Sequence, residues 1–185
     1  EVNSKTDIYV GTEFQFNSVT DKMPGYGRRI AQDVGVWGSF VQAEWRPLEL
    51  LSILIGGRYD LVNIEGNYAF EDEQFMNDQS LGAFVPRILM MVDLTTDWKF
   101  RASYARGYRA PQAFDEDLHI ETVGGAARFI RLGQDLQLER SKSTVLSLNY
   151  DKFVGNKQMN FVIEGFFTQL SNPFIFADQL ELPSG

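Results

Sequence analysis

The chain has 185 residues, of which 25 are acidic and 17 basic, and its formal net charge is −8. It contains no cysteine, which excludes disulfides and thiolate metal sites, and one histidine, which excludes a site built from several histidines. The negative balance argues against nonspecific binding to nucleic acid, which needs clustered Lys and Arg.

Apolar and polar residues alternate at every second position along much of the chain. This period predicts seven β-strands and no amphipathic helix. The segment 48–55, LELLSILI, also suits a buried helical turn, but the sequence GGRYD that follows it favours a strand. The predicted strands cover residues 8–16, 37–46, 51–61, 87–93, 98–105, 145–151 and 159–168.

The predicted connections are short and long in alternation. Tight turns are expected at 46–49, 94–97 and 151–157, whereas the segments near 20–34, 62–83 and 107–139 are long, polar and without periodicity. Structureless loops of about 20 residues are uncommon in compact soluble domains. Short turns at one end and long loops at the other are typical of outer-membrane β-barrels.

The two faces of the predicted strands differ in character. One face is apolar or small, and the other carries charges at mid-strand. A water-soluble barrel would bury the apolar face inside, whereas a membrane barrel turns it to lipid and keeps the polar face toward the lumen, which would suit these charges. The candidates for lumen-facing residues are Arg58, Asp60, Arg101 and Glu164.

Aromatic residues fall where the two interfaces of a membrane are expected. Trp45, Trp98 and Tyr150 lie beside the short turns, and Tyr59 and Phe167 lie about ten residues further along their strands, a rise of about 25 Å at a tilt near 40°. The alternative is a soluble, secreted β-sandwich that binds a ligand such as carbohydrate, with these aromatics in its core.

Four segments, in order along the chain, resemble the β-barrel of TonB-dependent outer-membrane receptors. VWGSFVQAEWRPLELLSILIGGRYD (36–60) resembles a strand–turn–strand unit, and RASYARGYRAP (101–111) resembles a strand that runs into an Arg-Ala-Pro box. LERSKSTVLSLNY (138–150) resembles the next strand, with Leu138 where proline is usual, and MNFVIEGFFTQLSNPF (159–174) resembles another strand with an aromatic end. The form of the segment that follows the box is similar to that in receptors of Bacteroides-like bacteria.

The resemblance implies an all-β fold, an antiparallel up-and-down transmembrane β-barrel of roughly 22 strands with a plugged lumen. Residues 1–185 are then a seven-strand segment of the barrel domain, and the plug domain and the rest of the barrel lie elsewhere. The implied location is the bacterial outer membrane. The implied partners are outer-membrane lipid, the plug domain of the same chain, the TonB protein and a small-molecule ligand, with no nucleic acid.

The implied function is uptake of a scarce nutrient such as an iron–siderophore complex, haem or cobalamin, and not enzymatic catalysis. No resident cofactor and no metal site are expected. In this family the substrate binds between extracellular loops and the plug, so the candidate ligand contacts lie at and after the Arg-Ala-Pro box. They are Tyr108, Arg109, Asp115, Glu116, Asp117 and His119.

The same segment has other interpretations. Its charges suit an ordinary solvated loop, with residues 109–111 as a structural corner, because Pro111 fixes its own φ and holds Ala110 extended. Some haem receptors of the family carry a histidine between this box and an Asn-Pro-Asp-Leu box, and an imidazole is a competent axial ligand for haem iron, which makes His119 a candidate. The second box is degraded here, with Gly133 and Gln134 in place of Asn and Pro. Residues 115–117 and the acidic segment 65–78 offer carboxylates to a divalent cation, although their spacing matches no EF-hand. No pair of carboxylates stands out as a glycosidase site, and no phosphate loop or nucleophile elbow is present.

Overall fold

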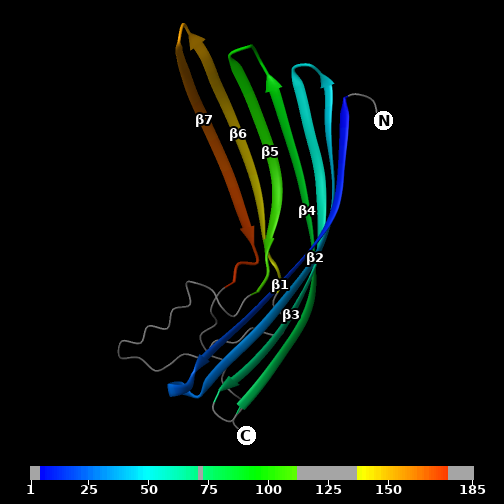
Figure 1. Ribbon diagram of the computed structural model, residues 1–185, viewed down its shortest axis with the longest axis vertical. Coiled ribbons are helices and arrows are strands. Elements are labelled where there is room, and N and C mark those ends of the chain that lie inside the picture. The colour runs from blue at the N-terminus through cyan, green and yellow to red at the C-terminus, as the bar shows by residue number, and fades with distance from the viewer. Residues whose placement is uncertain (1–4, 71–72, 112–136, 175–185) are drawn as a thin grey trace.

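The computed structural model describes residues 5–70, 73–111 and 137–174. These residues form seven β-strands and one short 3-10 helix, η1 (Pro24–Tyr26), as Figure 1 shows. No helix in this part of the chain is long and apolar enough to cross a membrane. The strands are β1 (Thr6–Met23), β2 (Arg28–Leu48), β3 (Leu51–Phe70), β4 (Glu73–Asp93), β5 (Trp98–Arg109), β6 (Glu139–Val154) and β7 (Lys157–Ser171).

All seven strands pair in chain order into one antiparallel sheet, β1-β2-β3-β4-β5-β6-β7. This up-and-down order confirms the predicted topology and the predicted number of strands. The connections β2–β3, β4–β5 and β6–β7 lie together at one end of the sheet (Figure 1). A β-sandwich needs a second sheet packed on the first, and the described residues form only one sheet.

The turns at this end are tight for local reasons. Asp97 and Trp98 both donate backbone N–H bonds to the hydroxyl of Thr95, which closes the β4–β5 turn. Gly155 is the first of the two residues in the β6–β7 turn and has a φ of 62°. Glycine adopts this positive φ without the steric cost that other residues pay. The turn between β2 and β3 lies at residues 49–50, so residues 46–48 belong to β2 instead of the predicted turn.

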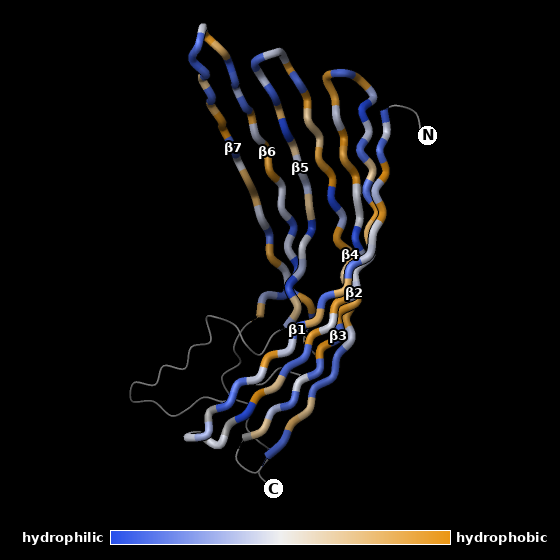
Figure 2. Tube along the Cα trace, viewed as in Figure 1, coloured by the Kyte–Doolittle hydropathy of each residue, from blue (hydrophilic) through white to orange (hydrophobic). Residues whose placement is uncertain are grey.

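The register places apolar side chains on one face of all seven strands, which we call the apolar face. Hydrophobic side chains on it are exposed, for example Val10 at 74% and Phe14 at 65%. The alternation of hydropathy along each strand is visible in Figure 2. One cross-strand row of this face contains Ile8, Ala43, Ile55, Ile88, Tyr104, Thr144 and Phe167.

The prediction of long structureless loops near 20–34 and 62–83 is wrong. β1 continues to Met23 and β2 begins at Arg28, while β3 and β4 together cover 51–93 except for 71–72. The hydropathy pattern of these segments does not continue that of the strands, because it inverts beyond the apolar band. There the side chains on the opposite face are buried and apolar, such as Ile30 and Ile64 at 0% exposure, and the residues between them are polar.

These inward apolar residues form a small cluster at the far end of the sheet. Its buried members are Val34, Val62 and Ile64, and Tyr108 and Ala110 from the end of β5 pack against it. The end of β5 therefore leaves its neighbour β4, and its last residues contact the face of β2 and β3 that is opposite the apolar face.

The separation of β5 from β4 has a defined position. Pairing between these strands runs from Asp93↔Lys99 to Arg87↔Ala105 and stops there. The next residue of β4 is Pro86, which has no amide hydrogen to donate to a ladder. Beyond it, residues 73–86 pair with β3 alone in the described part of the chain.

Candidate functional site

A buried charged residue, Asp60, lies at the middle of the sheet on the face opposite the apolar face, which we call the polar face. Its side chain is only 4% exposed. Nε of Arg58, two residues earlier on the same side of β3, donates to its Oδ1 at 2.6 Å. A buried carboxylate needs such a partner, because removing an unpaired charge from water is very unfavourable.

Arg58 also binds a second carboxylate, from a strand two places away. Its Nη1 donates to Oε2 of Glu13 at 2.7 Å, so the guanidinium bridges β1 and β3. The side chain of Arg58 is 32% exposed and that of Glu13 is 58% exposed. The guanidinium of Arg58 thus lies between two carboxylates, the buried one of Asp60 and the exposed one of Glu13.

The intervening strand β2 makes room for this bridge with a glycine. Glu13 is opposite Gly38, and Gly38 is opposite Asp60. A Cβ at position 38 would overlap the side chains of both Arg58 and Asp60. The absence of a side chain at Gly38 is therefore what lets β1 and β3 touch across β2.

Tyr108 completes the site from the end of β5. Its hydroxyl donates to Oδ2 of Asp60 at 2.9 Å. Burial of the ring, together with the hydrogen bond and the negative charge of Asp60, raises the pKa of Tyr108 to about 12. The phenol therefore stays protonated at physiological pH and remains a donor, and both oxygens of Asp60 have partners.

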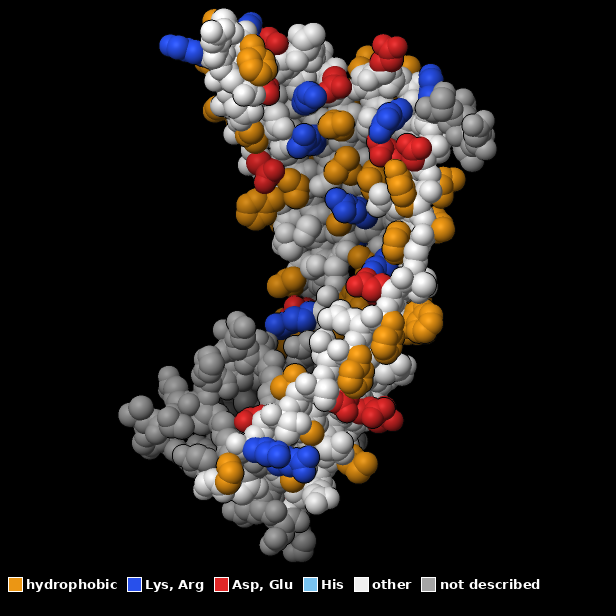
Figure 3. Space-filling model, in the orientation of Figure 1, with side chains coloured by type: hydrophobic (Ala, Val, Ile, Leu, Met, Phe, Trp, Pro, Cys, Tyr) orange, Lys and Arg blue, Asp and Glu red, His pale blue; other side chains and the backbone are white. Residues whose placement is uncertain are grey.

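This arrangement has two consequences. The ion pair of Arg58 and Glu13 is partly exposed on the polar face, and the hydrogen bond from Tyr108 to Asp60 fixes the end of β5 to the sheet. In the described part of the chain, no three His, Cys, Asp or Glu side chains are grouped so as to hold a metal ion. Charged side chains of both signs lie near one another on the face turned to the viewer in Figure 3.

The four predicted lumen-facing residues all lie on the polar face. Arg101 is opposite Ser147, which in turn is opposite Glu164, so these three share one row of β5, β6 and β7. This row is separate from the site around Arg58 and Asp60. The register places all four residues on one face, and among the four an ion pair links Arg58 and Asp60.

The predicted ligand contacts divide into two groups. Tyr108 contacts Asp60, while Arg109 forms an ion pair of 3.3 Å with Glu139 and lies 5.0 Å from the ring centre of Phe174. Both are thus engaged with other parts of the chain. The remaining candidates, Asp115, Glu116, Asp117 and His119, lie outside the described residues.

Sequence reasoning missed Glu13 and Gly38 as members of the site. Glu13 was visible as a charge at mid-strand among alternating apolar residues, the same signal that selected Arg58 and Asp60. Gly38 carried no such signal, because its role depends on the register between β1, β2 and β3.

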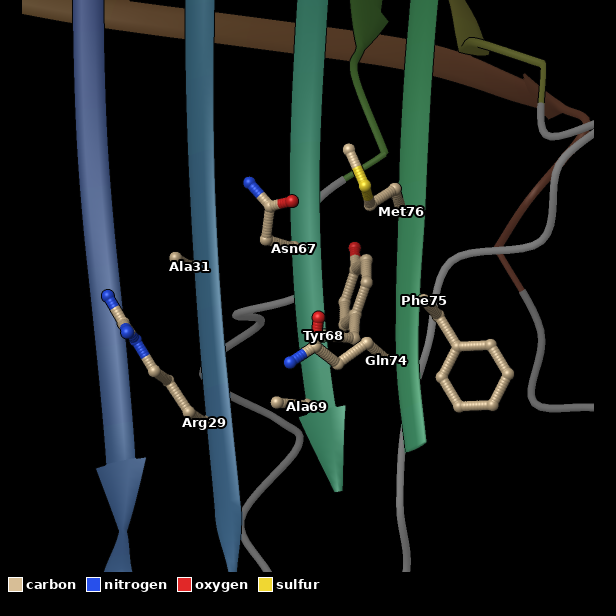
Figure 4. A pocket seen from close by; sticks show the side chains of 8 residues that line it. All are labelled: Arg29, Ala31, Asn67, Tyr68, Ala69, Gln74, Phe75 and Met76. Atoms are coloured by element: carbon tan, nitrogen blue, oxygen red, sulfur yellow. The ribbon is translucent and has the colours of Figure 1, made fainter. Parts of the chain in front are cut away.

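A separate hollow of 270 Å³ lies at the far end of β2, β3 and β4 (Figure 4). Two cross-strand rows border it, Arg29–Ala69–Gln74 and Ala31–Asn67–Met76. Both rows belong to the same side of the sheet as the apolar face. It contains none of the predicted site residues.

Comparison with known proteins agrees with this geometry. The model of the family described as TonB dependent receptor-like, beta-barrel, matches residues 2–181. The Iron-regulated outer membrane virulence protein of Vibrio cholerae serotype O1 is 29% identical to the chain over 115 residues. That match covers 62% of this chain but only 15% of the Vibrio protein.

Proposed function

Because this chain belongs to the TonB-dependent receptor-like β-barrel family, and so is part of a barrel in the bacterial outer membrane, we propose that it serves nutrient uptake. The full-length protein imports a scarce small molecule, using energy that the TonB protein passes on from the inner membrane. The chain contributes seven strands to a larger barrel of roughly 22 strands, filled by a plug domain. Neighbouring barrel strands pair with the free edges of β1 and β7.

The polar face is the side on which the plug is held. The observation that carries this proposal is the bridge from Glu13 through Arg58 to the buried Asp60. Asp60 is buried and fixes Arg58 in place, while Arg58 and Glu13 are partly exposed on the polar face, which supports a charged surface there for the plug. Arg101 and Glu164 extend this charged surface along β5 and β7.

The ligand we propose first is an iron complex, such as an iron–siderophore or haem, with cobalamin as the next candidate. The Vibrio relative is named as iron-regulated, which supports iron for this chain without identifying the complex. Asp115, Glu116, Asp117 and His119 remain candidates for direct ligand contact. Tyr108 and Arg109 lie at the root of the same connection, where they act by fixing its start.

The test is growth of a strain that lacks the full-length gene, supplied in turn with single sources of iron, haem or cobalamin. We expect a growth defect on one source that the wild-type gene restores, and loss of restoration when the TonB protein is removed. Equal growth of the deletion strain on every source would contradict nutrient uptake. For haem, titration of the full-length receptor should give a Soret shift that His119→Ala weakens. An unchanged affinity in that variant would exclude His119 as the axial ligand.

A further inference from the structure

The side chains of β5 that begin on the apolar face end on the opposite side of the sheet. Trp98 and Tyr108 are an even number of residues apart, and pairing with β6 continues without a shift as far as Arg109. Side chains alternate along a strand, so these two residues belong to the same face of β5. The hydroxyl of Tyr108 nevertheless binds Asp60 on the polar face of β3. Tyr108 and Ala110 also pack against the apolar cluster on that side.

The edge of β4 that β5 has left has no strand partner within the described part of the chain. The amide of Asp93 donates to the carbonyl of Leu50, so the odd-numbered residues of β4 direct their backbone groups toward β3. The even-numbered residues therefore face β5, and the carbonyl of Gly82 accordingly accepts a bond from Arg140 of β6 at 3.3 Å. Pro86 is one of them, and it has no N–H to offer. The others along this edge are Gln74, Met76, Asp78, Ser80, Gly82 and Phe84.

The register of the remaining ladder defines a second position for the end of β5. Pairing between β4 and β5 stops at Arg87↔Ala105. Continued in the same register, it would place Tyr108 opposite Phe84, whose ring is 56% exposed on the apolar face. This pair would exchange two backbone hydrogen bonds and bring two aromatic rings together across the strands.

The contacts of the two positions exclude each other. Tyr108 cannot bind Asp60 and lie opposite Phe84 on the apolar face at the same time. In the second position the carbonyl of Gly82 would face β5, so Arg140 would lose its acceptor. Each position therefore gains hydrogen bonds that the other lacks, and Pro86 withholds one ladder donor from the second.

We propose that the end of β5, residues 106–109, is a two-position element of the barrel wall. In the observed position it is held over the polar face by Tyr108 and Asp60, and in the other it continues along the edge of β4. The change moves the start of the connection after Arg109 from the polar face to the rim of the wall. It also removes one donor from Asp60, and so couples this connection to the ion pair of Arg58 and Glu13.

Disulfide trapping in the full-length receptor, reconstituted in phosphatidylcholine bilayers, tests for the second position. The cysteines of Ala83→Cys/Arg109→Cys face each other when β5 continues along β4. Directly opposite Cα atoms then lie about 4.5–5.5 Å apart, within the range of a disulfide. Leu89→Cys/Ser103→Cys is the matched control, because these residues are already opposite in the observed ladder. We expect fast cross-linking of the control pair and slower cross-linking of the 83/109 pair.

Two substitutions should shift the balance toward the second position. Pro86→Val supplies the missing N–H, and Tyr108→Phe removes the bond to Asp60. One hydrogen bond changes the ratio of two populations roughly fivefold, so each substitution should speed cross-linking of the 83/109 pair by about that factor. Arg46→Gln should have no effect, because this exposed arginine binds Glu44 of its own strand. None of the three should alter the control pair.

Two results would overturn the proposal. One is the absence of cross-linking at 83/109 in every background while the control pair reacts, and the other is an equal rate in wild type, Pro86→Val and Tyr108→Phe. Heat-modifiable gel migration verifies folding. If the paired cysteines prevent folding, hydrogen exchange of the Gly82 and Phe84 amides decides: slower exchange in Pro86→Val supports two positions, and unchanged exchange contradicts them. Nutrient uptake is not measured, so failure here leaves the proposed function unaffected.

Discussion

Tyr108 and Asp60 are 48 positions apart in the chain, and the phenol of one donates to the carboxylate of the other at 2.9 Å. This hydrogen bond joins the end of β5 to β3, although β4 lies between them in the sheet. It forms where β4 and β5 have already separated. The contact therefore fixes the root of the connection from β5 to β6 against the wall of the barrel.

Tyr108→Phe should lower the free energy of unfolding of the full-length protein by about 1–3 kcal/mol, because it leaves Oδ2 of the buried Asp60 without a donor. The contribution should depend on pH in a defined way. The pKa of Tyr108 is raised from 10.0 to about 12 in the folded protein. The stabilisation is thus fully present below pH 10 and is lost as the pH rises toward 12.

The measurement is urea unfolding of wild type and variant in detergent at several pH values. The two should converge in stability between pH 10 and 12. Tyr104→Phe is the control, since this tyrosine of the same strand accepts a bond from the exposed Arg106. If the difference between wild type and Tyr108→Phe is the same at every pH, the phenol does not donate to Asp60 in solution.

Two arginine–carboxylate pairs with the same spacing should differ greatly in their contribution to stability. Arg58–Asp60 and Arg46–Glu44 both join residues two apart on one strand, each at 2.6 Å. Asp60 is 4% exposed, but Arg46 is 58% exposed. Arg58→Met leaves a buried carboxylate unpaired and should destabilise the barrel by about 3–5 kcal/mol. Arg46→Met should change stability by no more than about 1 kcal/mol.

Urea unfolding of the two full-length variants, followed by intrinsic fluorescence, gives both numbers. Similar losses for Arg58→Met and Arg46→Met would mean that burial of Asp60 does not hold in the membrane. The double variant Arg58→Met/Asp60→Asn separates the effect of the charge of Asp60 from the effect of its packing. The double variant should be less destabilised than Arg58→Met alone.

Gly38→Ala should disrupt the bridge between β1 and β3 without touching any charge. Its new methyl group would overlap Arg58 and Asp60, and overpacking of this kind costs about 1–3 kcal/mol. Gly35→Ala on the same strand is the control, because a Cβ there meets no atom within 4 Å. Stability is compared by thermal migration of the folded form on gels. Equal midpoints of thermal unfolding for Gly38→Ala and Gly35→Ala would show that Gly38 does not lie against Arg58 and Asp60.

The sequence predicts the seven strands and their apolar face because both depend on local alternation, whereas the up-and-down order was predicted from the short connections and the family resemblance. Trp98, Phe100 and Ala102 lie on one face of β5 simply because side chains alternate along a strand. The Arg58–Asp60 pair could likewise be predicted from the sequence, since residues two apart on a strand share a face. These are consequences of the strand period alone.

Other parts of the fold depend on contacts between distant residues, which a single sequence does not display. The far ends of β1 to β4 look like loops because Ile30, Val62 and Ile64 are covered on the polar face instead of the apolar one. Glu13 and Gly38 join the site only through the register of three strands. Tyr108 was predicted as a ligand contact from its position at the Arg-Ala-Pro box, and its bond to Asp60 depends on the separation of β5 from β4.

The tryptophans provide a test of where the apolar band begins and ends. Trp98 lies beside the β4–β5 turn, with its ring centre 4.7 Å from that of Tyr150, and should sit at one membrane interface. Val41 lies midway between Trp37 and Trp45 on the apolar face of β2, about 13 Å of strand from each. A tryptophan there should sit near the centre of the bilayer.

Single-tryptophan variants of the full-length receptor, with the other tryptophans replaced by Phe, are reconstituted in lipids brominated at shallow or deep acyl positions. Fluorescence of Trp98 should be quenched more by shallow bromine. That of Val41→Trp should be quenched more by deep bromine, because the interface and the bilayer centre differ in depth by about half of the 25 Å band. Deep quenching of Trp98, or no lipid quenching at position 41, would contradict the assignment of the apolar face to lipid.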